Sequence, residues 1–278
     1  MSEAVAPDSV VVATDGSAHA ERAVRWAGEQ AALEGRRLVV VSCGEDAGPV
    51  VERTVAAVTL AHPDLDVRGF ADPGDPRRVL LDLASRARLL VLGSRGRGTV
   101  RSILLGSVST AVSAHAGCPV VVCRPSEGAQ AVPGVMVGAD STPESVPVLE
   151  FAYRIADLRD LPLTVRHCFW DAVAAVADYR ESRGEPVEVP ELEELHASLA
   201  ASVAGLAEVY PDVQVTLSLE HGLVDEALSP RGQAWDLVVV GRHPMASIGR
   251  VLTGSIATAV VARSASTVAV VPEPVGHG

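Results

Sequence analysis

The stretch VVVATDGS, residues 10–17, reads as an apolar strand that ends in an acidic residue, a glycine and a hydroxyl side chain. It recurs as VMVGADST, residues 135–142, at an offset of 125. The next apolar run, LVVVSC at 38–43, recurs at the same offset as LTVRHC at 163–168. A repeat of this length indicates two copies of a domain-sized unit, because solenoid repeats are far shorter.

Further along the chain the offset becomes 148. LLVLG at 89–93 matches LVVVG at 237–241, and the second copy therefore carries 23 additional residues (148 minus 125). They fall after its second strand, in the acidic stretch around 172–194. Three interpretations of this stretch remain open: a lid, an interface and a flexible loop. We expect one domain over residues 1–126 and a second over residues 133–278.

Each copy reads as strands alternating with helices. The strands are short, continuous apolar runs, such as 39–41 and 237–240, which is typical of a parallel sheet covered on both faces. Alternating β and α units predict an α/β fold with a doubly wound parallel sheet in each copy. In such sheets, ligands bind beyond the carboxyl ends of the strands, where the strand order reverses.

The composition excludes several functions. The chain has 278 residues and a formal net charge of −12, and all 23 basic residues are arginine. Without lysine it cannot be a P-loop NTPase or a Schiff-base enzyme. The acidic balance argues against nucleic-acid binding, and no apolar run reaches the about 18 to 20 residues of a membrane span. We expect a cytoplasmic protein, away from the membrane, whose four cysteines, none in a CxxC pair, stay reduced.

A glycine-rich loop follows the fourth strand of the first copy, GSRGRGTVRSILLGS at 93–107. Glycines let backbone N–H groups approach phosphate oxygens, and the helix expected from Ser107 to about His115 adds further N–H groups and a partial positive charge. The loop arginines add positive potential, and the Ser107 hydroxyl is expected both to cap the helix and to contact phosphate. The alternative is a surface loop whose glycines serve only its turns.

The spacing of this loop resembles the signature G-x2-G-x9-G-[S/T] of the universal stress protein family, and the chain resembles two such domains in tandem. The resemblance implies a five-stranded parallel sheet in each copy, like that of the adenine nucleotide alpha hydrolases. It also implies ATP, with or without magnesium, across the strand ends. Asp15 would lie near the adenosine, although helix capping is an alternative role for it. The residues assigned to the nucleotide are Asp15, Gly16, Ser17, Cys43, Gly93, Arg95, Gly96, Arg97, Gly106, Ser107, Val108 and Ser109.

The second copy departs from this pattern. Pro244 replaces the second glycine of the loop, and proline has no N–H to donate. Arg166 and His167 add bulk at the end of the second strand. The net charge is also uneven, with 15 acidic residues against 14 arginines up to residue 130 and 20 against 9 beyond it. We expect the first site to be filled and the second to be weak or empty. The second site would comprise Asp140, Cys168, Gly241, Gly254 and Ser255.

The expected role is binding rather than catalysis. No general base is evident near the loop, and the histidines lack metal-ligand spacing, so neither a catalytic residue nor a metal site is expected. We therefore predict a non-catalytic, ATP-dependent regulator of the stress response, with a slow ATPase and a nucleotide-independent structural adaptor as alternatives. The resemblance further implies that the terminal strands, 120–123 and 268–271, pair the two copies as an intrachain pseudo-dimer, and that two chains form a homodimer.

Overall fold

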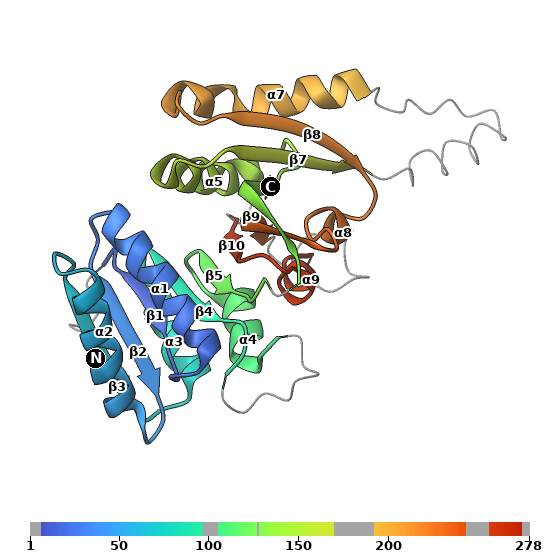
Figure 1. The fold of residues 1–278 in the computed structure, drawn as a ribbon. Coiled ribbons are helices and arrows are strands. Elements are labelled where there is room, and N and C mark those ends of the chain that lie inside the picture. Colours follow the sequence, from blue (N-terminus) through green and yellow to red (C-terminus); the bar gives the residue numbers. More distant parts are fainter. Residues whose placement is uncertain (1–6, 97–104, 127, 170–191, 243–255, 274–278) are drawn as a thin grey trace.

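The computed structural model describes residues 7–96, 105–126, 128–169, 192–242 and 256–273 (Figure 1). It has the expected α/β fold, with helices on both faces of a mostly parallel sheet. The elements of the first half are β1 Val10–Ala13, α1 Ala18–Leu33, β2 Leu38–Cys43, α2 Ala47–Ala61, β3 Val67–Asp72, α3 Pro76–Ala84, β4 Leu89–Gly93, α4 Ser107–His115 and β5 Val120–Cys123. Those of the second half are β6 Gln130–Gly138, the 3-10 helix η1 Pro143–Ser145, α5 Val146–Arg159, β7 Leu163–Phe169, α7 Leu192–Val209, β8 Val215–His221, α8 Val224–Ala227, β9 Gln233–Arg242, α9 Ile256–Arg263 and β10 Val268–Pro272.

The strands of the two halves form one continuous sheet, in the order β3-β2-β1-β4-β5-β10-β9-β6-β7-β8. Each half therefore repeats the same order of five parallel strands, as the internal repeat predicts. The halves meet where β5 pairs antiparallel with β10, with Val122 opposite Val268. We call this pairing the seam. It is the pairing of terminal strands that the sequence analysis expected.

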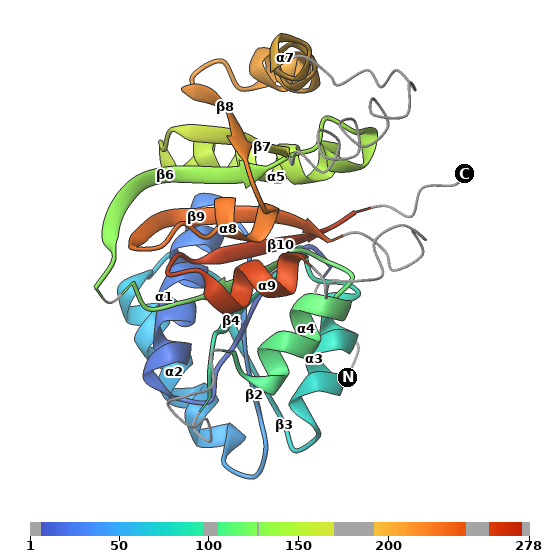
Figure 2. The ribbon, with the colours of Figure 1, turned by 90° about the vertical axis from the view of Figure 1, so that its right-hand side faces the viewer.

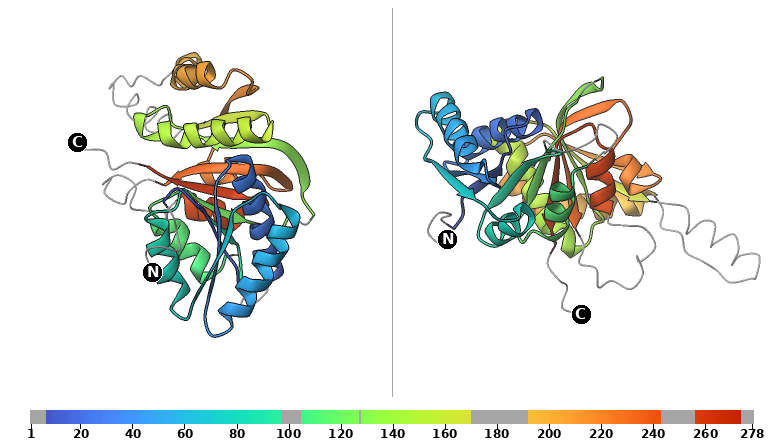
Figure 3. Two further views of the ribbon diagram at one scale, coloured as in Figure 1. Left: turned by 90° about the vertical axis from the view of Figure 1, so that its left-hand side faces the viewer. Right: turned by 90° about the horizontal axis from the view of Figure 1, so that it is seen from below.

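Two apolar cores run along the two faces of the sheet and across the seam. Helices α1, α2, α5 and α7 pack on one face, and α3, α4, α8 and α9 cover the other (Figures 2 and 3). The strands contribute to both, because successive side chains point to opposite faces: Val10 and Val12 lie in the first core, and Val11 lies in the second. This two-sided burial explains why the strands read as continuous apolar runs.

The halves differ at a few elements. Helix α3 has nine residues, whereas its counterpart α8 has four. Strand β6 already starts at Gln130 and pairs there with Gln233 of β9, inside the stretch where the sequence pattern is interrupted between the copies. The 23 additional residues fall between β7 and α7, where residues 170–191 lie outside the described ones.

Candidate functional site

A cavity of about 720 Å³ lies at the carboxyl ends of β1, β2 and β4. The chain leaves β1 toward β2 on one side and reaches β4 on the other, so the cavity lies at the point where the strand order reverses. Most of the predicted nucleotide-binding residues line it, namely Asp15, Cys43, Gly93, Arg95, Gly96, Gly106, Ser107, Val108 and Ser109. Arg97 lies outside the described residues.

Two hydrogen bonds fix the ends of the glycine-rich loop. The N–H of Gly106 donates to the carbonyl of Ser94 over 2.9 Å, and the Ser109 hydroxyl donates to the carbonyl of Gly93 over 2.8 Å. The first turn of α4 is thereby held against the end of β4. The backbone N–H groups of Ser107, Val108 and Ser109 open this helix and have no carbonyl one turn earlier to bind. They form a ready site for an anion.

The start of α4 corrects one expectation about Ser107. Helix α4 does span Ser107–His115, but its N-cap is Gly106, and no side chain caps it. Ser107 is the first helical residue and is exposed, so its hydroxyl does not perform the capping role expected from the sequence.

The three glycines of the motif differ in what a side chain at each position would meet. A Cβ on Gly93 would lie 2.7 Å from the backbone carbon and oxygen of His19, and one on Gly96 would lie 2.8 Å from a carboxylate oxygen of Asp15. The packing of the chain itself therefore requires Gly93, whereas a side chain at position 96 would displace the carboxylate of Asp15. A Cβ on Gly106 would meet nothing closer than 3.5 Å, and its φ of −72° suits any residue. The packing of the chain therefore does not require glycine at position 106, and the absence of a side chain there leaves room in the cavity.

The turn after β1 positions the carboxylate of Asp15. Oδ1 of Asp15 accepts a hydrogen bond from the N–H of Ser17 over 3.0 Å. Gly16 has a φ of 75°, which glycine adopts without strain. The Ser17 hydroxyl accepts from the N–H of Ala20 as the N-cap of α1. Gly16 and Ser17 are therefore turn and cap residues, and neither is among the residues that line the cavity.

Opposite charges gather at different parts of the cavity wall. Glu45 and Asp46 line it beside Cys43. Burial, together with the charges of Asp72 and Asp75, raises the pKa of the Cys43 thiol to about 11. The thiol is therefore neutral at pH 7 and serves as a wall rather than a nucleophile.

The loop side of the cavity is basic. Burial lowers the pKa of His19, and the charges of Arg22, Arg95 and Arg124 lower it further. His19 is consequently neutral, and its Nδ1 accepts a hydrogen bond from Arg22 over 3.0 Å. Arg95 lines the cavity, and its buried Nε has no hydrogen-bond partner among the described residues. The described part of the loop thus offers a cation, Arg95, together with the start of α4.

In the second half, side chains lie at the equivalent strand ends. Leu228, the counterpart of Leu80, is fully buried, and its Cδ1 would lie 2.6 Å from a Cβ on Gly138 at the end of β6. Arg166 donates to the carbonyl of Ala227 over 2.8 Å. His167 donates from Nδ1 to the carbonyl of Ala139 over 3.0 Å. The bulk predicted from Arg166 and His167 therefore lies at the strand ends, tied to neighbouring backbone.

A buried carboxylate lies at the second-half counterpart of Gly93. Oε1 of Glu273 would be 1.8 Å from a Cβ on Gly241, and Glu273 is 8% exposed. The carboxyl group of Glu273 therefore takes up the space next to Gly241. Asp140 repeats the turn of Asp15, since its Oδ1 accepts from the N–H and hydroxyl of Thr142. Cys168 is half-buried at the end of β7, and Gly254 and Ser255 lie outside the described residues.

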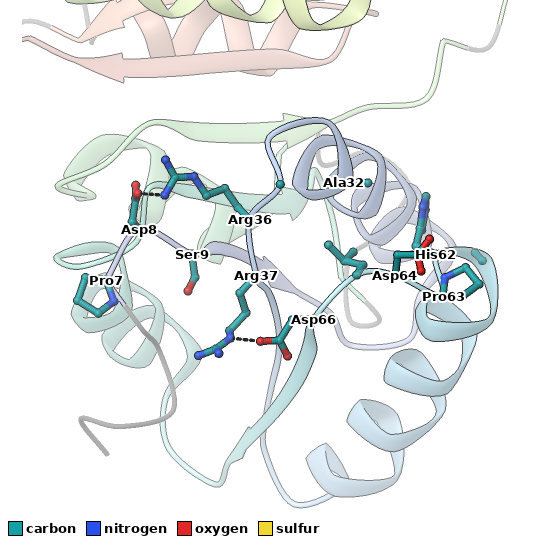
Figure 4. Close-up of a pocket in the computed structure, with 13 residues that line it drawn as sticks. Pro7, Asp8, Ser9, Ala32, Arg36, Arg37, His62, Pro63, Asp64 and Asp66 are labelled. Carbon is teal, nitrogen blue, oxygen red and sulfur yellow. Dashed lines mark hydrogen bonds and ion pairs between the residues drawn. The ribbon is translucent and has the colours of Figure 1, made fainter.

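A second hollow, of about 710 Å³, lies at the opposite ends of the strands (Figure 4). Its charges are paired with one another: Arg36 contacts Asp8, and Nε of Arg37 lies 2.7 Å from Asp66. Because these charges already satisfy each other, and because no helix begins there with free N–H groups, this hollow is a weaker candidate for a ligand site.

Sequence reasoning missed several residues that shape the two regions. Ser94 closes the loop through its carbonyl, and a backbone role of this kind leaves no mark on residue type. His19 and Arg22 interact with each other beside the loop only in the folded chain, and their spacing in the sequence does not indicate this role. Leu228 could have been found from its alignment with Leu80 at the offset of 148. In the part of the chain that the structure describes, no group of three or more His, Cys, Asp or Glu side chains could hold a metal ion, and no helix is long and apolar enough to cross a membrane.

Comparison with known proteins gives one consistent result. The model of the universal stress protein family matches residues 7–124 and 134–272. A universal stress protein of Mycobacterium tuberculosis is 30% identical over 91% of this chain and 92% of its own length. Among solved structures, a protein of unknown function from Pseudomonas aeruginosa matches 96% of this chain and 93% of its own, with a TM-score of 0.64 at 17% identity. A universal stress protein of Archaeoglobus fulgidus matches 95% of this chain and 98% of its own, with a TM-score of 0.60 at 18% identity.

Proposed function

The chain belongs to the universal stress protein family, and on that premise we propose that its first half binds ATP, with or without magnesium, as a regulatory ligand. The observation that carries the proposal is the clamped loop. The bond from Gly106 to Ser94 and the bond from Ser109 to Gly93 hold the first turn of α4 at the mouth of the cavity. Three backbone N–H groups at a helix start suit a phosphate.

The size and the charge distribution of the cavity support the same ligand. Its volume of about 720 Å³ lies in the range of about 300 to 1,000 Å³ that small-molecule sites occupy. The basic end at Arg95 suits the phosphates. The acidic wall at Glu45 and Asp46 suits donors such as ribose hydroxyls. In this arrangement, the adenine would lie along Ser42 and Cys43, at the end of β2.

The same residues argue against rapid turnover of ATP. The described part of the loop contributes Arg95 as its titratable side chain, and a guanidinium does not accept a proton from water. Asp15 is engaged with the N–H of Ser17. We therefore propose a non-catalytic, nucleotide-dependent role in the stress response. Ligand at 1,000 times its Kd would stabilise the bound state by about 4 kcal/mol, which is enough to shift a conformational equilibrium.

We propose that the second half binds nucleotide weakly or not at all. Leu228 and the bonded side chains of Arg166 and His167 occupy the strand ends, and the carboxylate of Glu273 lies against Gly241. The homodimer of whole chains and the cytoplasmic location also remain proposals. Sedimentation of the purified protein tests the former, and cell fractionation tests the latter.

One experiment separates ATP binding from the alternatives. The purified protein is denatured, and the released nucleotide is identified and counted. A second sample is incubated with ATP and magnesium while ADP is followed. Bound ATP with negligible ADP release supports the proposal. Rapid ADP release would indicate an ATPase. An absence of nucleotide, together with no thermal shift in millimolar ATP, would indicate an adaptor.

A further inference from the structure

The two helices beside the seam carry opposite charges at equivalent positions of the internal repeat. Glu29 lies in α1 and Glu34 is the C-cap of that helix. The offset of 125 places Arg154 and Arg159 of α5 at the same two positions. The pairs cross the seam (Figure 3 shows α1 and α5 on the same face of the sheet). Glu34 lies 2.6 Å from Nη1 of Arg154, and Glu29 lies 3.6 Å from Nη1 of Arg159.

The Glu34 pair is well buried. The side chain of Glu34 is 4% exposed, and its two oxygens also contact Nε of Arg88 at 2.6 Å and Nε2 of Gln30 at 2.8 Å. Burial raises the pKa of Glu34, but the hydrogen bond from Gln30 and the charges of Arg154 and Arg88 outweigh it and lower the pKa overall. Glu34 therefore stays ionised at the seam, where a second anion would be costly.

The Arg159 pair is anchored by three kinds of contact. Its guanidinium lies 4.5 Å from the centroid of the Trp26 ring, and its Nε donates to Oε1 of Gln30 over 2.9 Å. With 17% of its side chain exposed, Arg159 is largely screened from water. Burial lowers the pKa of Arg159, but the guanidinium stays charged, and the aromatic face, the amide oxygen and the carboxylate of Glu29 all attract it.

The strands of the seam do not distinguish one half from the other. Val120, Val121 and Val122 of β5 face Val270, Ala269 and Val268 of β10. These edges are nearly identical apolar runs, and backbone hydrogen bonds carry no sequence information. A second copy of β5 would pair with β5 as well as β10 does. Any selection must therefore come from the flanking side chains.

We propose that the seam is a charge-selective surface that accepts the unlike half of this chain and rejects a like half. Pairing two first halves in the same geometry would place Glu29 against Glu34, and pairing two second halves would place Arg154 against Arg159. Like charges in a partly desolvated contact repel. The edge of the first half consequently fits a partner that carries two cations at the α5 positions, and the second half of this chain provides them.

On the opposite face of the sheet at the seam, each half contributes one arginine that donates to a backbone carbonyl of the other half. Arg124, after β5, donates to the carbonyl of Val261 in α9 over 2.7 Å. Arg242, at the end of β9, donates to the carbonyl of Ala116 at the end of α4 over 2.6 Å. The repeat places Ser94 where the second half has Arg242, and Pro272 where the first half has Arg124. A like pairing would replace one of these bonds with a second copy of the other, so the selection rests on the charges of α1 and α5.

A four-variant cycle in the full chain tests the proposal. At the Glu29–Arg159 contact, the wild type is the unlike pairing, R159E imitates two first halves, E29R imitates two second halves, and E29R/R159E is an unlike pairing with reversed signs. The reporter is Cys123 of β5, which is 2% exposed and whose pKa burial raises to about 12. Its alkylation rate, measured peptide by peptide, rises when the seam opens. Cys43 is the internal reference, because it lies away from the seam at the end of β2.

We expect R159E and E29R each to raise the alkylation rate of Cys123 several-fold. In the double variant, this rate should fall again by about two- to tenfold. R159Q is the matched control, since it loses the Trp26 contact without adding an anion, and R159E should exceed it. Glu29→Gln with Arg159→Gln repeats the cycle with smaller perturbations should a reversal prevent folding. Three results would each overturn the proposal. The effects of the two single variants could prove additive in the double variant, the Cys123 rate could be unchanged in R159E and E29R, or R159E and R159Q could give equal rates.

Discussion

The carboxyl ends of β1, β2 and β4 enclose an open cavity, whereas those of β6, β7 and β9 carry the side chains of Arg166 and His167, bonded to neighbouring carbonyls, and have Glu273 packed against Gly241. The strand order is the same in both halves, so the fold does not decide which side chains lie at the strand ends. The difference between the two halves comes from a few positions at the strand ends. Val41 and Ser42 of the first half are replaced by Arg166 and His167 of the second. A duplicated fold can thus keep its sheet and its cores while its two copies carry different side chains at the carboxyl ends of their strands.

The largest expected effect is at Gly106. Gly106→Arg places a long side chain in the space that the glycine leaves open, and we expect ATP affinity to fall by more than about 100-fold, equivalent to about 2.7 kcal/mol. Gly254→Arg, at the matching position of the second copy, should leave affinity unchanged. Isothermal titration measures both. Equal loss in the two variants would show that the halves do not differ as we describe.

The second prediction compares glycines at the ends of β4 and β9. In Gly93→Ala the new Cβ meets the backbone of His19 at 2.7 Å, whereas in Gly241→Ala it meets chiefly the carboxylate of Glu273. Backbone cannot move aside as easily as a side-chain end, so Gly93→Ala should destabilise the fold by about 1–3 kcal/mol and Gly241→Ala by less.

Urea unfolding measures that difference, and Gly106→Ala is the control, with a free energy of unfolding close to the wild type. A Gly93→Ala variant as stable as this control would contradict the assigned packing of Gly93 against α1.

The third prediction concerns the cysteines at the ends of β2 and β7. Burial raises the pKa of both Cys43 and Cys168 to about 11. Their thiolate fractions, and hence their alkylation rates, should rise about tenfold per pH unit between pH 8 and 10. ATP should protect Cys43, which lines the cavity, and not Cys168. Peptide-resolved alkylation with and without ATP measures this, and equal protection of the two cysteines would place nucleotide in both halves.

The smallest expected effect is in the acid stability of the contact between halves. The pKa of Glu34 is lowered in the folded protein. Its contribution is therefore fully present above the unfolded value of about 4.5, and it is lost as the pH falls through the lowered folded value. The difference in urea midpoint between wild type and Glu34→Gln should narrow from pH 6 to pH 3. A constant difference would indicate that the charge of Glu34 plays no part.

The architecture could be predicted from the sequence more completely than the details of the site. Apolar runs without polar alternation, repeated at two offsets, predicted the parallel sheet in each half, because it follows from burial and from duplication. The pairing of the terminal strands was implied by the resemblance to the family, since the residues alone give only an apolar edge. The start of α4 at Ser107 was also predicted. These features depend on residue type, which the sequence displays directly.

Other features depend on backbone contacts or on distant neighbours. The carbonyl of Ser94 closes the loop, and a carbonyl is common to every residue. Gly16 and Ser17 form the turn after β1 and the N-cap of α1, and their contact with nucleotide stays a prediction. The contact of Glu273 with Gly241 joins residues that are adjacent only after folding. Patterns along the chain do not contain that information.

The most direct test of the central claim is an electron-density map of the protein crystallised with excess ATP. We predict triphosphate density within hydrogen-bonding distance of the N–H groups of Ser107, Val108 and Ser109, with Arg95 beside it, and no such density against Gly241. An empty first-half cavity, or nucleotide bound in the second half alone, would contradict the account.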